Sequence, residues 1–134
     1  MENYIIELYR HLAAIYDEVY GEEQRRKYWM VASQVGERAV DVGCGVGLVF
    51  EAVQSYVVCL DISLDMLQIA RRRRGELGEL LAASYWLPPF RRGAFHTALF
   101  ISSIDLALVD KVVEIWGDIV GKVVFEFRGV WRIG

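Results

Sequence analysis

A glycine-rich segment directly after a short apolar run is the feature that most constrains the fold of this chain. Residues 41–47 read Asp-Val-Gly-Cys-Gly-Val-Gly, and they follow an expected strand start at Ala39-Val40. A second apolar strand is predicted over residues 56–61, and it ends in Asp61, about 20 positions after Asp41. A tight glycine turn lets a ligand lie against bare backbone, and an acid at the tip of the next strand can accept both hydroxyls of a ribose. The sequence therefore predicts a site for a ribose-containing cofactor.

The spacing of the glycines distinguishes between two kinds of cofactor. A dinucleotide fingerprint reads G-x-G-x-x-G and holds a pyrophosphate at a helix start. Here Gly43, Gly45 and Gly47 alternate, and the carboxylate of Asp41 lies two residues upstream. A carboxylate at that place attracts a cation and repels a pyrophosphate. S-adenosylmethionine carries an ammonium and a sulfonium but no phosphate, so it suits this charge better than NAD.

These residues resemble the first motif of the class I S-adenosylmethionine-dependent methyltransferases. Residues 60–67 are similar to the family's second-strand motif, and Leu87-Pro88 matches the pair after its third strand. The resemblance spans roughly residues 16–127 and is closest to small-molecule and quinone-type methyltransferases, whose N-terminal Tyr-Asp pair is similar to Tyr16-Asp17. It implies a Rossmann-like fold, a small-molecule acceptor and S-adenosylhomocysteine as the product.

The resemblance also implies which residues contact the cofactor. The sequence departs from the family at the end of the third strand, where an acid often receives the adenine amino group. Ala83 and Ser84 stand there instead, and serine offers only a hydroxyl. Tyr85 and Trp86 are candidates for a stacking face, or else for core packing. The expected cofactor-binding residues are Tyr16, Asp41, Gly43, Cys44, Gly45, Gly47, Asp61, Ile62, Met66, Ala83 and Ser84.

The chemistry of methyl transfer asks little of the protein, because the methyl group of a sulfonium is already activated. The enzyme must align the acceptor and exclude water, and it needs a base only if the acceptor keeps a proton. No catalytic residue is identified; Asp105 and Ser102, near the end of the fourth strand, are the candidates, and Asp105 also suits a helix cap. The sequence there lacks the Pro-Pro-aromatic signature of amino-methylating members, which disfavours methylation of bases or glutamine.

The pattern of apolar residues predicts one domain over residues 1–134, with an N-terminal helical lid (1–35) and a Rossmann-like core (36–134). Helices are expected over residues 2–20 and 22–35. Further strands are expected near 80–83, 97–102 and 122–127, with helices 48–55 and 63–74 between strands. Alternation of this kind gives a mostly parallel sheet of about five strands with helices on both faces and a ligand at the carboxyl ends of the strands.

The stretch after the fifth expected strand is short. Only residues 128–134 follow it, too few for the antiparallel hairpin of two further strands that the family usually adds. We therefore expect an uncovered edge, which a homodimer or another protein partner would cover. The alternative is that residues 130–133 fold back over that edge.

Composition limits the remaining functions. A net charge of −3 disfavours nucleic acid as a partner, and the apolar runs are too short for a membrane span. With no export signal, the chain is expected in the cytoplasm, where Cys44 and Cys59 are expected as free thiols, although neighbouring strands would allow a bridge. The scarcity of asparagine hints at a thermophile. No residue spacing suits a metal site.

Two further features leave alternatives open. The run Arg71–Arg74 suits the carboxyl end of a helix, and the alternative is an anionic partner such as RNA. The shortened sheet and the missing adenine acid also allow a catalytically silent, S-adenosylmethionine-binding regulatory or scaffolding subunit that needs a protein partner. A nicotinamide oxidoreductase is a third hypothesis, which the glycine spacing disfavours.

Overall fold

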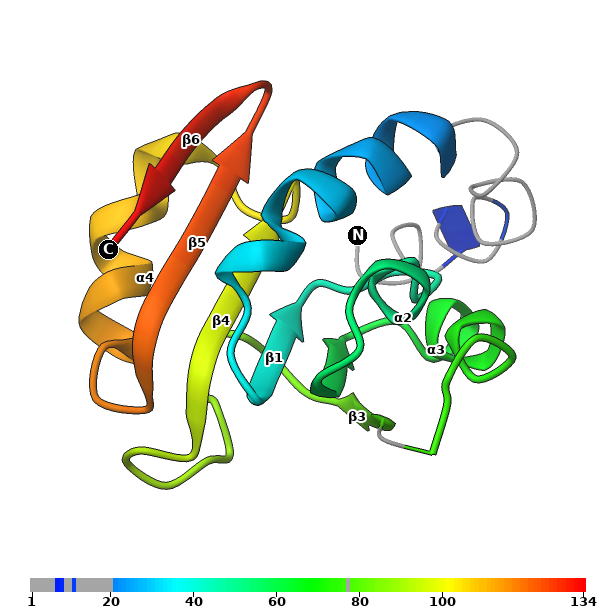
Figure 1. Cartoon of the computed structure of the whole chain (residues 1–134), viewed down its shortest axis with the longest axis horizontal. Helices are drawn as coiled ribbons and strands as arrows, with labels where there is room; N and C mark the ends of the chain where they lie inside the picture. Colours follow the sequence, from blue (N-terminus) through cyan, green and yellow to red (C-terminus); the bar gives the residue numbers. More distant parts are fainter. Residues whose placement is uncertain (1–6, 9–10, 12–20, 77) are drawn as a thin grey trace.

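The computed structural model describes residues 7–8, 11, 21–76 and 78–134. In this part of the chain, six strands form one sheet with helices on both faces (Figure 1). The strands are β1 (Arg38–Val42), β2 (Tyr56–Asp61), β3 (Gly78–Ala82), β4 (Phe95–Ile101), β5 (Val120–Phe127) and β6 (Val130–Ile133). The helical elements are residues 21–31, η1 (Ala32–Gln34), α2 (Val49–Ala52), α3 (Leu64–Ala70), η2 (Leu106–Leu108) and α4 (Val109–Trp116). The helix expected over residues 2–20 lies mostly outside the described residues.

The strand order β3-β2-β1-β4-β5-β6 places β1 in the interior of the sheet. The first five strands in sequence pair in parallel, so their carboxyl ends share one edge. From β1 the chain builds outward through β2 and β3 and then returns to the other side of β1 with β4. This reversal is a topological switch point, where open α/β sheets bind their ligands. The sheet is therefore the Rossmann-like arrangement that the sequence predicts, with one antiparallel strand added.

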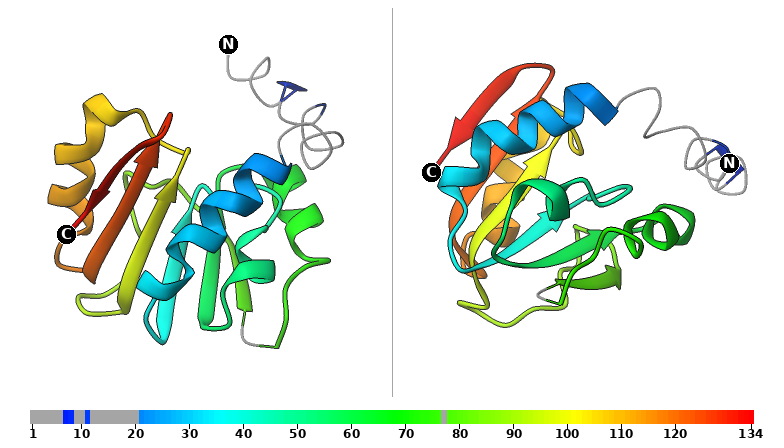
Figure 2. Two further views of the ribbon diagram at one scale, coloured as in Figure 1. Left: turned by 45° about the horizontal axis from the view of Figure 1, so that its top comes forward. Right: turned by 45° about the vertical axis from the view of Figure 1, so that its right-hand side comes forward.

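Two apolar layers sandwich the sheet because successive side chains of a strand face opposite sides. On one face Val57, Leu99 and Val124 pack with the helix of residues 21–31 and with α2. On the other face Phe100 and Phe125 pack against α4, among the side chains of a second buried cluster. Figure 2 shows the helix of residues 21–31 lying across one face of the sheet, with α4 on the opposite side. That helix covers the face on which Asp41 also lies.

Local capping agrees with the predicted helix starts. The hydroxyl of Ser63 accepts a hydrogen bond from the Met66 amide at 3.2 Å and begins α3. The carboxylate of Asp105 accepts one from the Ala107 amide at 2.9 Å and begins η2. The expected helix over 22–35 is present: the described part of it runs over residues 21–31, and the 3₁₀ helix η1 follows as its last turn. The expected helix over 48–55 is reduced to the single turn of α2.

The prediction of an uncovered β5 edge is wrong. Strand β6 pairs with β5 in antiparallel fashion, with Phe127 opposite Val130. Arg128 and Gly129 form the connection with φ angles of 50° and 82°. Positive φ at both positions is the geometry of a type I′ hairpin turn, which needs only two residues. Seven residues are therefore enough for a turn and one short strand, as the alternative of a folded-back tail supposes.

The expectation of free thiols is also wrong, because Cys44 and Cys59 form a disulfide. Asp41 lies opposite Cys59 in the β1–β2 register. The glycine turn then carries Cys44 back toward β2, so that the two Cα atoms are 5.3 Å apart. This distance is within the range that a disulfide requires. The bond ties the glycine turn to the second strand.

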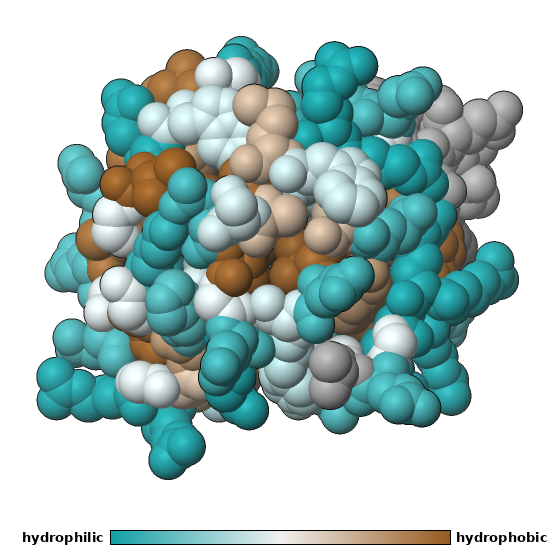
Figure 3. Space-filling model, in the orientation of Figure 1, coloured by the Kyte–Doolittle hydropathy of each residue, from teal (hydrophilic) through white to brown (hydrophobic). Residues whose placement is uncertain are grey.

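The surface is mixed in character. Figure 3 shows the face that carries the helix of residues 21–31, with hydrophilic side chains around its rim and hydrophobic side chains in smaller groups between them. Trp29 and Met30, on that helix, are each 61% exposed. Among the described residues, no helix combines the length and the apolar character that crossing a bilayer requires.

The disulfide should stabilise the fold measurably. Cys44 and Cys59 are 15 positions apart, and closing a loop of that size lowers the entropy of the unfolded chain, which stabilises the fold by about 3 kcal/mol. We expect a reducing agent to lower the free energy of unfolding, measured by urea titration, by about this amount. The variant Cys44→Ala/Cys59→Ala should not respond to the reducing agent. Alkylation of both cysteines in unreduced, denatured protein would contradict the bond.

Candidate cofactor site

A cleft opens at the carboxyl ends of the central strands, at the switch point. Its volume is about 400 Å³, within the ~300–1,000 Å³ typical of small-molecule sites. It is lined by the last residues of β1 and β2 and by residues that follow β1, β2, β3 and β4, namely Val42, Gly43, Gly45, Leu60, Asp61, Ile62, Met66, Ala83, Ser84, Tyr85, Trp86, Ser102, Ser103 and Ile104. Eight of these residues belong to the sets of candidate cofactor-binding and catalytic residues predicted from the sequence: Gly43, Gly45, Asp61, Ile62, Met66, Ala83, Ser84 and Ser102.

The three glycines of the turn all have positive φ, but they have different surroundings. A β-carbon on Gly43 would lie 2.5 Å from the Ser103 β-carbon, and one on Gly47 would lie 2.8 Å from that of Ala70. These two glycines allow close packing of the turn against its neighbours. A β-carbon on Gly45 would meet nothing within 4 Å. The space above Gly45 is open and belongs to the cleft.

Asp61 joins the glycine turn to the start of α3. Its Oδ2 accepts a hydrogen bond from the Gly45 amide at 2.9 Å, and its Oδ1 accepts one from the Ser63 amide at 2.8 Å. Burial raises the pKa of Asp61, while backbone hydrogen bonds from Ser63, Gly45 and Ile62 oppose that shift. Each carboxylate oxygen has a second lone pair for a ligand hydroxyl. The geometry suits the ribose role that the spacing predicts.

Asp41 is fully buried at the end of β1. The Tyr28 hydroxyl donates a hydrogen bond to its Oδ2 at 2.7 Å. Burial raises the pKa of Asp41 to about 7; the Tyr28 hydrogen bond lowers it and the charge of Asp61 raises it. The other oxygen, Oδ1, has no hydrogen-bond partner within the described part of the chain, and neither has the buried Ser103 hydroxyl. An ammonium group would satisfy such an orphaned acceptor.

The far side of the cleft lies beyond the end of β3. Ala83 and Ser84 are there, as expected, and no acid takes their place. The Ser84 hydroxyl accepts a hydrogen bond from the Trp86 amide at 3.2 Å. The rings of Tyr85 and Trp86 are 4.4 Å apart at 46°, and the Tyr85 carbonyl accepts a hydrogen bond from the Trp116 indole at 3.0 Å. Residues 84–86 are therefore held to the core by the Trp116 hydrogen bond, and the side chains of Tyr85 and Trp86 line the cleft.

Several expected site residues lie elsewhere. Cys44 is bonded to Cys59, Gly47 packs against α3, and Asp41 is fully buried at the end of β1; none of the three lines the cleft. Asp105 caps η2 and does not line it either, so of the two catalytic candidates only Ser102 does. Tyr16 lies outside the described residues.

The arginine run has a structural role at this site. Arg73 donates a hydrogen bond to the Val46 carbonyl at 2.9 Å and pairs with Glu51 at 3.3 Å. Arg74 lies 3.9 Å from Glu79. The first of these contacts supports the glycine turn from outside the cleft.

Sequence analysis missed Tyr28. No pattern marks a tyrosine on an amphipathic helix as the partner of a buried carboxylate 13 positions later. Among the described residues, no group of three or more histidine, cysteine or acidic side chains is placed to hold a metal ion.

The site's features fit S-adenosylmethionine. The open space above Gly45 leaves room for a ligand on the backbone, and Asp61 presents oxygens suited to a ribose. The orphaned Oδ1 of Asp41 suits a cationic group at the other end of the ligand. Nothing in this arrangement favours a pyrophosphate, because both acids would repel it.

Comparisons with known proteins agree with this geometry. A family model described as a methyltransferase domain matches residues 40–134. No curated protein matches the sequence significantly.

Three solved structures illustrate the likeness of fold. The first is the complex of the Haloferax volcanii Trm112 methyltransferase activator with a protein described as a methyltransferase (TM-score 0.74, 18% identity, 87% of this chain and 58% of that chain). The second is a protein of Methanococcus maripaludis described as an S-adenosyl-L-methionine-dependent methyltransferase (0.70, 15%, 90% and 64%). The third is DhpI in complex with S-adenosylhomocysteine (0.67, 17%, 90% and 65%). The chain thus spans less than two thirds of the length of each.

The family match and the DhpI complex indicate S-adenosylmethionine as the cofactor of this fold. The match covers β2 to β6, most of β1 and every described residue of the cleft. The chain belongs to the methyltransferase domain family of class I S-adenosylmethionine-dependent methyltransferases.

Proposed function

We propose that this chain binds S-adenosylmethionine in the cleft and transfers its methyl group to a small-molecule acceptor. The observation that carries the proposal is that an open glycine backbone and a ribose-type acid line one cleft, while an orphaned buried carboxylate oxygen, that of Asp41, lies at the end of β1 where the glycine turn begins. Family membership supports the same cofactor. The acceptor would enter beside Ser102, Ser103 and Ile104, which line the cleft after β4.

The cofactor supplies an activated methyl group, and the residues of this chain bind and orient it. In the proposed arrangement, Gly45 gives the ligand access to bare backbone, Asp61 holds the ribose and Asp41 holds the ammonium. The aromatic pair Tyr85 and Trp86 covers the adenine side in place of the usual acid. Alignment and exclusion of water then provide most of the rate enhancement. No covalent step on the protein is required.

A second candidate function is a cofactor-binding subunit that requires a protein partner. Two observations favour it: the chain resembles a protein that is in complex with an activator, and the adenine side of its cleft has no acid. Such a subunit would bind S-adenosylhomocysteine yet release none from S-adenosylmethionine when offered small hydroxyl, thiol and amine acceptors. Turnover by the isolated chain would dismiss this alternative.

The proposed function is tested first by calorimetric titration with S-adenosylmethionine, with S-adenosylhomocysteine and with NADH as a control. We expect micromolar binding of the two sulfur compounds at one site per chain, and no binding of NADH. Binding of NADH alone would favour an oxidoreductase, and binding of none of the three by a folded protein would refute the proposal.

Substitution of Gly45 tests the open space above the turn. Gly45→Ala places a methyl group where we expect the ligand, at a φ of 57°. Gly93→Ala is a matched control, because Gly93 has a φ of 69° and equally open surroundings in a loop at the opposite edge of the sheet. Both variants should lose about 1–2 kcal/mol of stability. Only Gly45→Ala should weaken S-adenosylhomocysteine binding. We expect its affinity to fall by about tenfold or more, which corresponds to the loss of one contact.

Substitution of Asp61 tests the ribose contact. Asp61→Ala removes an acceptor for which charged hydrogen bonds contribute about 1.5–3 kcal/mol, so binding should weaken by about 10- to 100-fold. Asp118→Ala is the control, since Asp118 is a 75% exposed acid at the amino end of β5. Equal affinities for the two variants would remove Asp61 from the site.

The pH dependence of binding tests Asp41. A cationic ammonium should bind the ionised carboxylate, and the pKa of Asp41 is about 7 in the ligand-free fold. Affinity for S-adenosylhomocysteine should therefore rise by up to about tenfold per pH unit below 7 and level off above it. Asp41→Asn should flatten this dependence and leave only the contribution of Asp61. A wild-type affinity that does not change with pH would contradict the ammonium assignment.

A further inference from the structure

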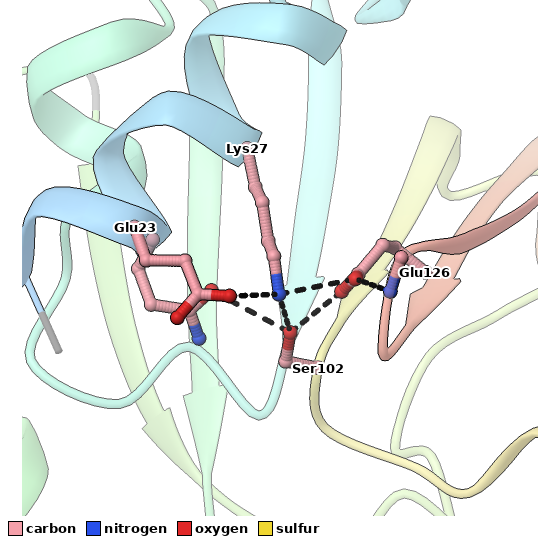
Figure 4. A network of polar contacts seen from close by, with 6 residues as sticks. Glu23, Lys27, Ser102 and Glu126 are labelled. Carbon is pink, nitrogen blue, oxygen red and sulfur yellow. Dashed lines mark hydrogen bonds and ion pairs between the residues drawn. The ribbon is translucent and has the colours of Figure 1, made fainter.

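A buried polar cluster lies beside the cleft and shares only Ser102 with the site described above. It joins Lys27 of the helix of residues 21–31 to Ser102 after β4 and to Glu126 near the end of β5 (Figure 4). The Lys27 ammonium lies 3.0 Å from Glu126 Oε2 and donates a hydrogen bond to the Ser102 hydroxyl at 2.9 Å. The Ser102 hydroxyl donates one to Glu126 Oε1 at 2.6 Å.

Glu126 is a charged residue with no solvent exposure. Burial raises the pKa of Glu126, but hydrogen bonds from Ser102, from the Gly129 amide and from Lys27 hold it below its ordinary value. It therefore stays ionised and paired with Lys27. Replacing a buried ion pair by apolar side chains is often neutral or stabilising, so stability alone gives no reason for one here. Its distinctive property is that it fixes the position of one element on another.

The backbone of Ser102 is also in a conformation that stability alone does not explain. Its φ is 56°, a conformation that side chains other than glycine adopt at a cost. Glycine would relieve this cost but would also remove the hydroxyl that bridges Lys27 and Glu126. The cluster thus retains a serine where the backbone favours glycine.

The helix that carries Lys27 also carries Tyr28, the partner of Asp41. Asp41 and Glu126 both face the side of the sheet that this helix covers, because Ala39 and Val124 lie on that side and strand side chains alternate. Strands β1 and β5 flank β4, which separates the two acids by about 10 Å. Adjacent residues of the helix therefore hold it at two separated points. Two such points fix its orientation as well as its position.

Neither Lys27 nor Glu126 lines the cleft or the small cavity between Tyr28 and the glycine turn. We propose that Lys27 and Glu126 are positioning residues for the cofactor site: their ion pair, joined through Ser102, places Tyr28 on Asp41 and thereby sets the affinity for the cofactor. This inference rests on the proposed function. Without the Tyr28 hydrogen bond, Asp41 would be less able to hold a charge in its buried place and would bind a cation more weakly.

A double-mutant cycle between Glu126 and Tyr28 tests this inference, with S-adenosylhomocysteine as the titrated ligand. Glu126→Gln and Tyr28→Phe should each weaken binding by about tenfold. In the Tyr28→Phe background, Glu126→Gln should have no further effect, because it acts through Tyr28. Its effect on the urea midpoint should persist in that background. Glu114→Gln, an exposed acid on α4, is the control and should leave the affinity unchanged.

The outcomes separate the two proposals. If wild-type protein does not bind S-adenosylhomocysteine, the proposed function falls and this inference falls with it. If wild-type protein binds but Glu126→Gln retains full affinity, or weakens it equally in both backgrounds, only the inference is overturned. Should Glu126→Gln fail to fold, Lys27→Met replaces it in the cycle with the same expectations. That variant leaves Glu126 its donors from Ser102 and Gly129.

Discussion

The burial of Asp41 is the constraint on which the rest of the site depends. A carboxylate without solvent contact ionises only at a cost, and a pKa near 7 corresponds to about 4 kcal/mol relative to an exposed aspartate. Asp41 stays protonated in the folded protein below about pH 7, whereas in the unfolded chain it loses its proton near pH 4. The group therefore makes the fold less stable as the pH rises from about 4 to 7. One oxygen is satisfied by Tyr28, and the other is left without a partner. A bound cation would offset the cost of ionising this buried carboxylate.

The other features of the site hold the backbone of the glycine turn in place and keep space open for a ligand. Asp61 ties the turn to α3 through two amide hydrogen bonds, and the disulfide ties the same turn to β2. Arg73 supports it from outside through the Val46 carbonyl. A turn anchored at these points can keep an open space above Gly45 without collapsing into it. This preorganisation lowers the entropy that ligand binding would otherwise lose.

The parts that the sequence predicted are those fixed by local patterns. The apolar pattern and the glycine turn predicted the bounds of β2 correctly at both ends. They also located the turn, Asp61 and the helix caps at Ser63 and Asp105, because each of these features depends on neighbours within a few positions. The β6 pairing was predicted only as an alternative, because a hairpin was judged by the length of the remaining chain, and a type I′ turn needs only two residues. The disulfide was missed because compartment, rather than strand register, decided the expectation.

Glu126 is an example of a residue whose partner cannot be predicted from the sequence. A single acid inside the apolar run of residues 123–127 is a visible anomaly, and an anomaly of that kind indicates a buried charge. Its partner cannot be read from the sequence, however, because Lys27 is almost a hundred positions away and one of several basic residues on its helix. Only the packing of that helix across β4 and β5 brings the two together. Charge pairs of high sequence separation therefore carry information about how an N-terminal segment sits on the sheet, and here they point to the segment that also completes Asp41.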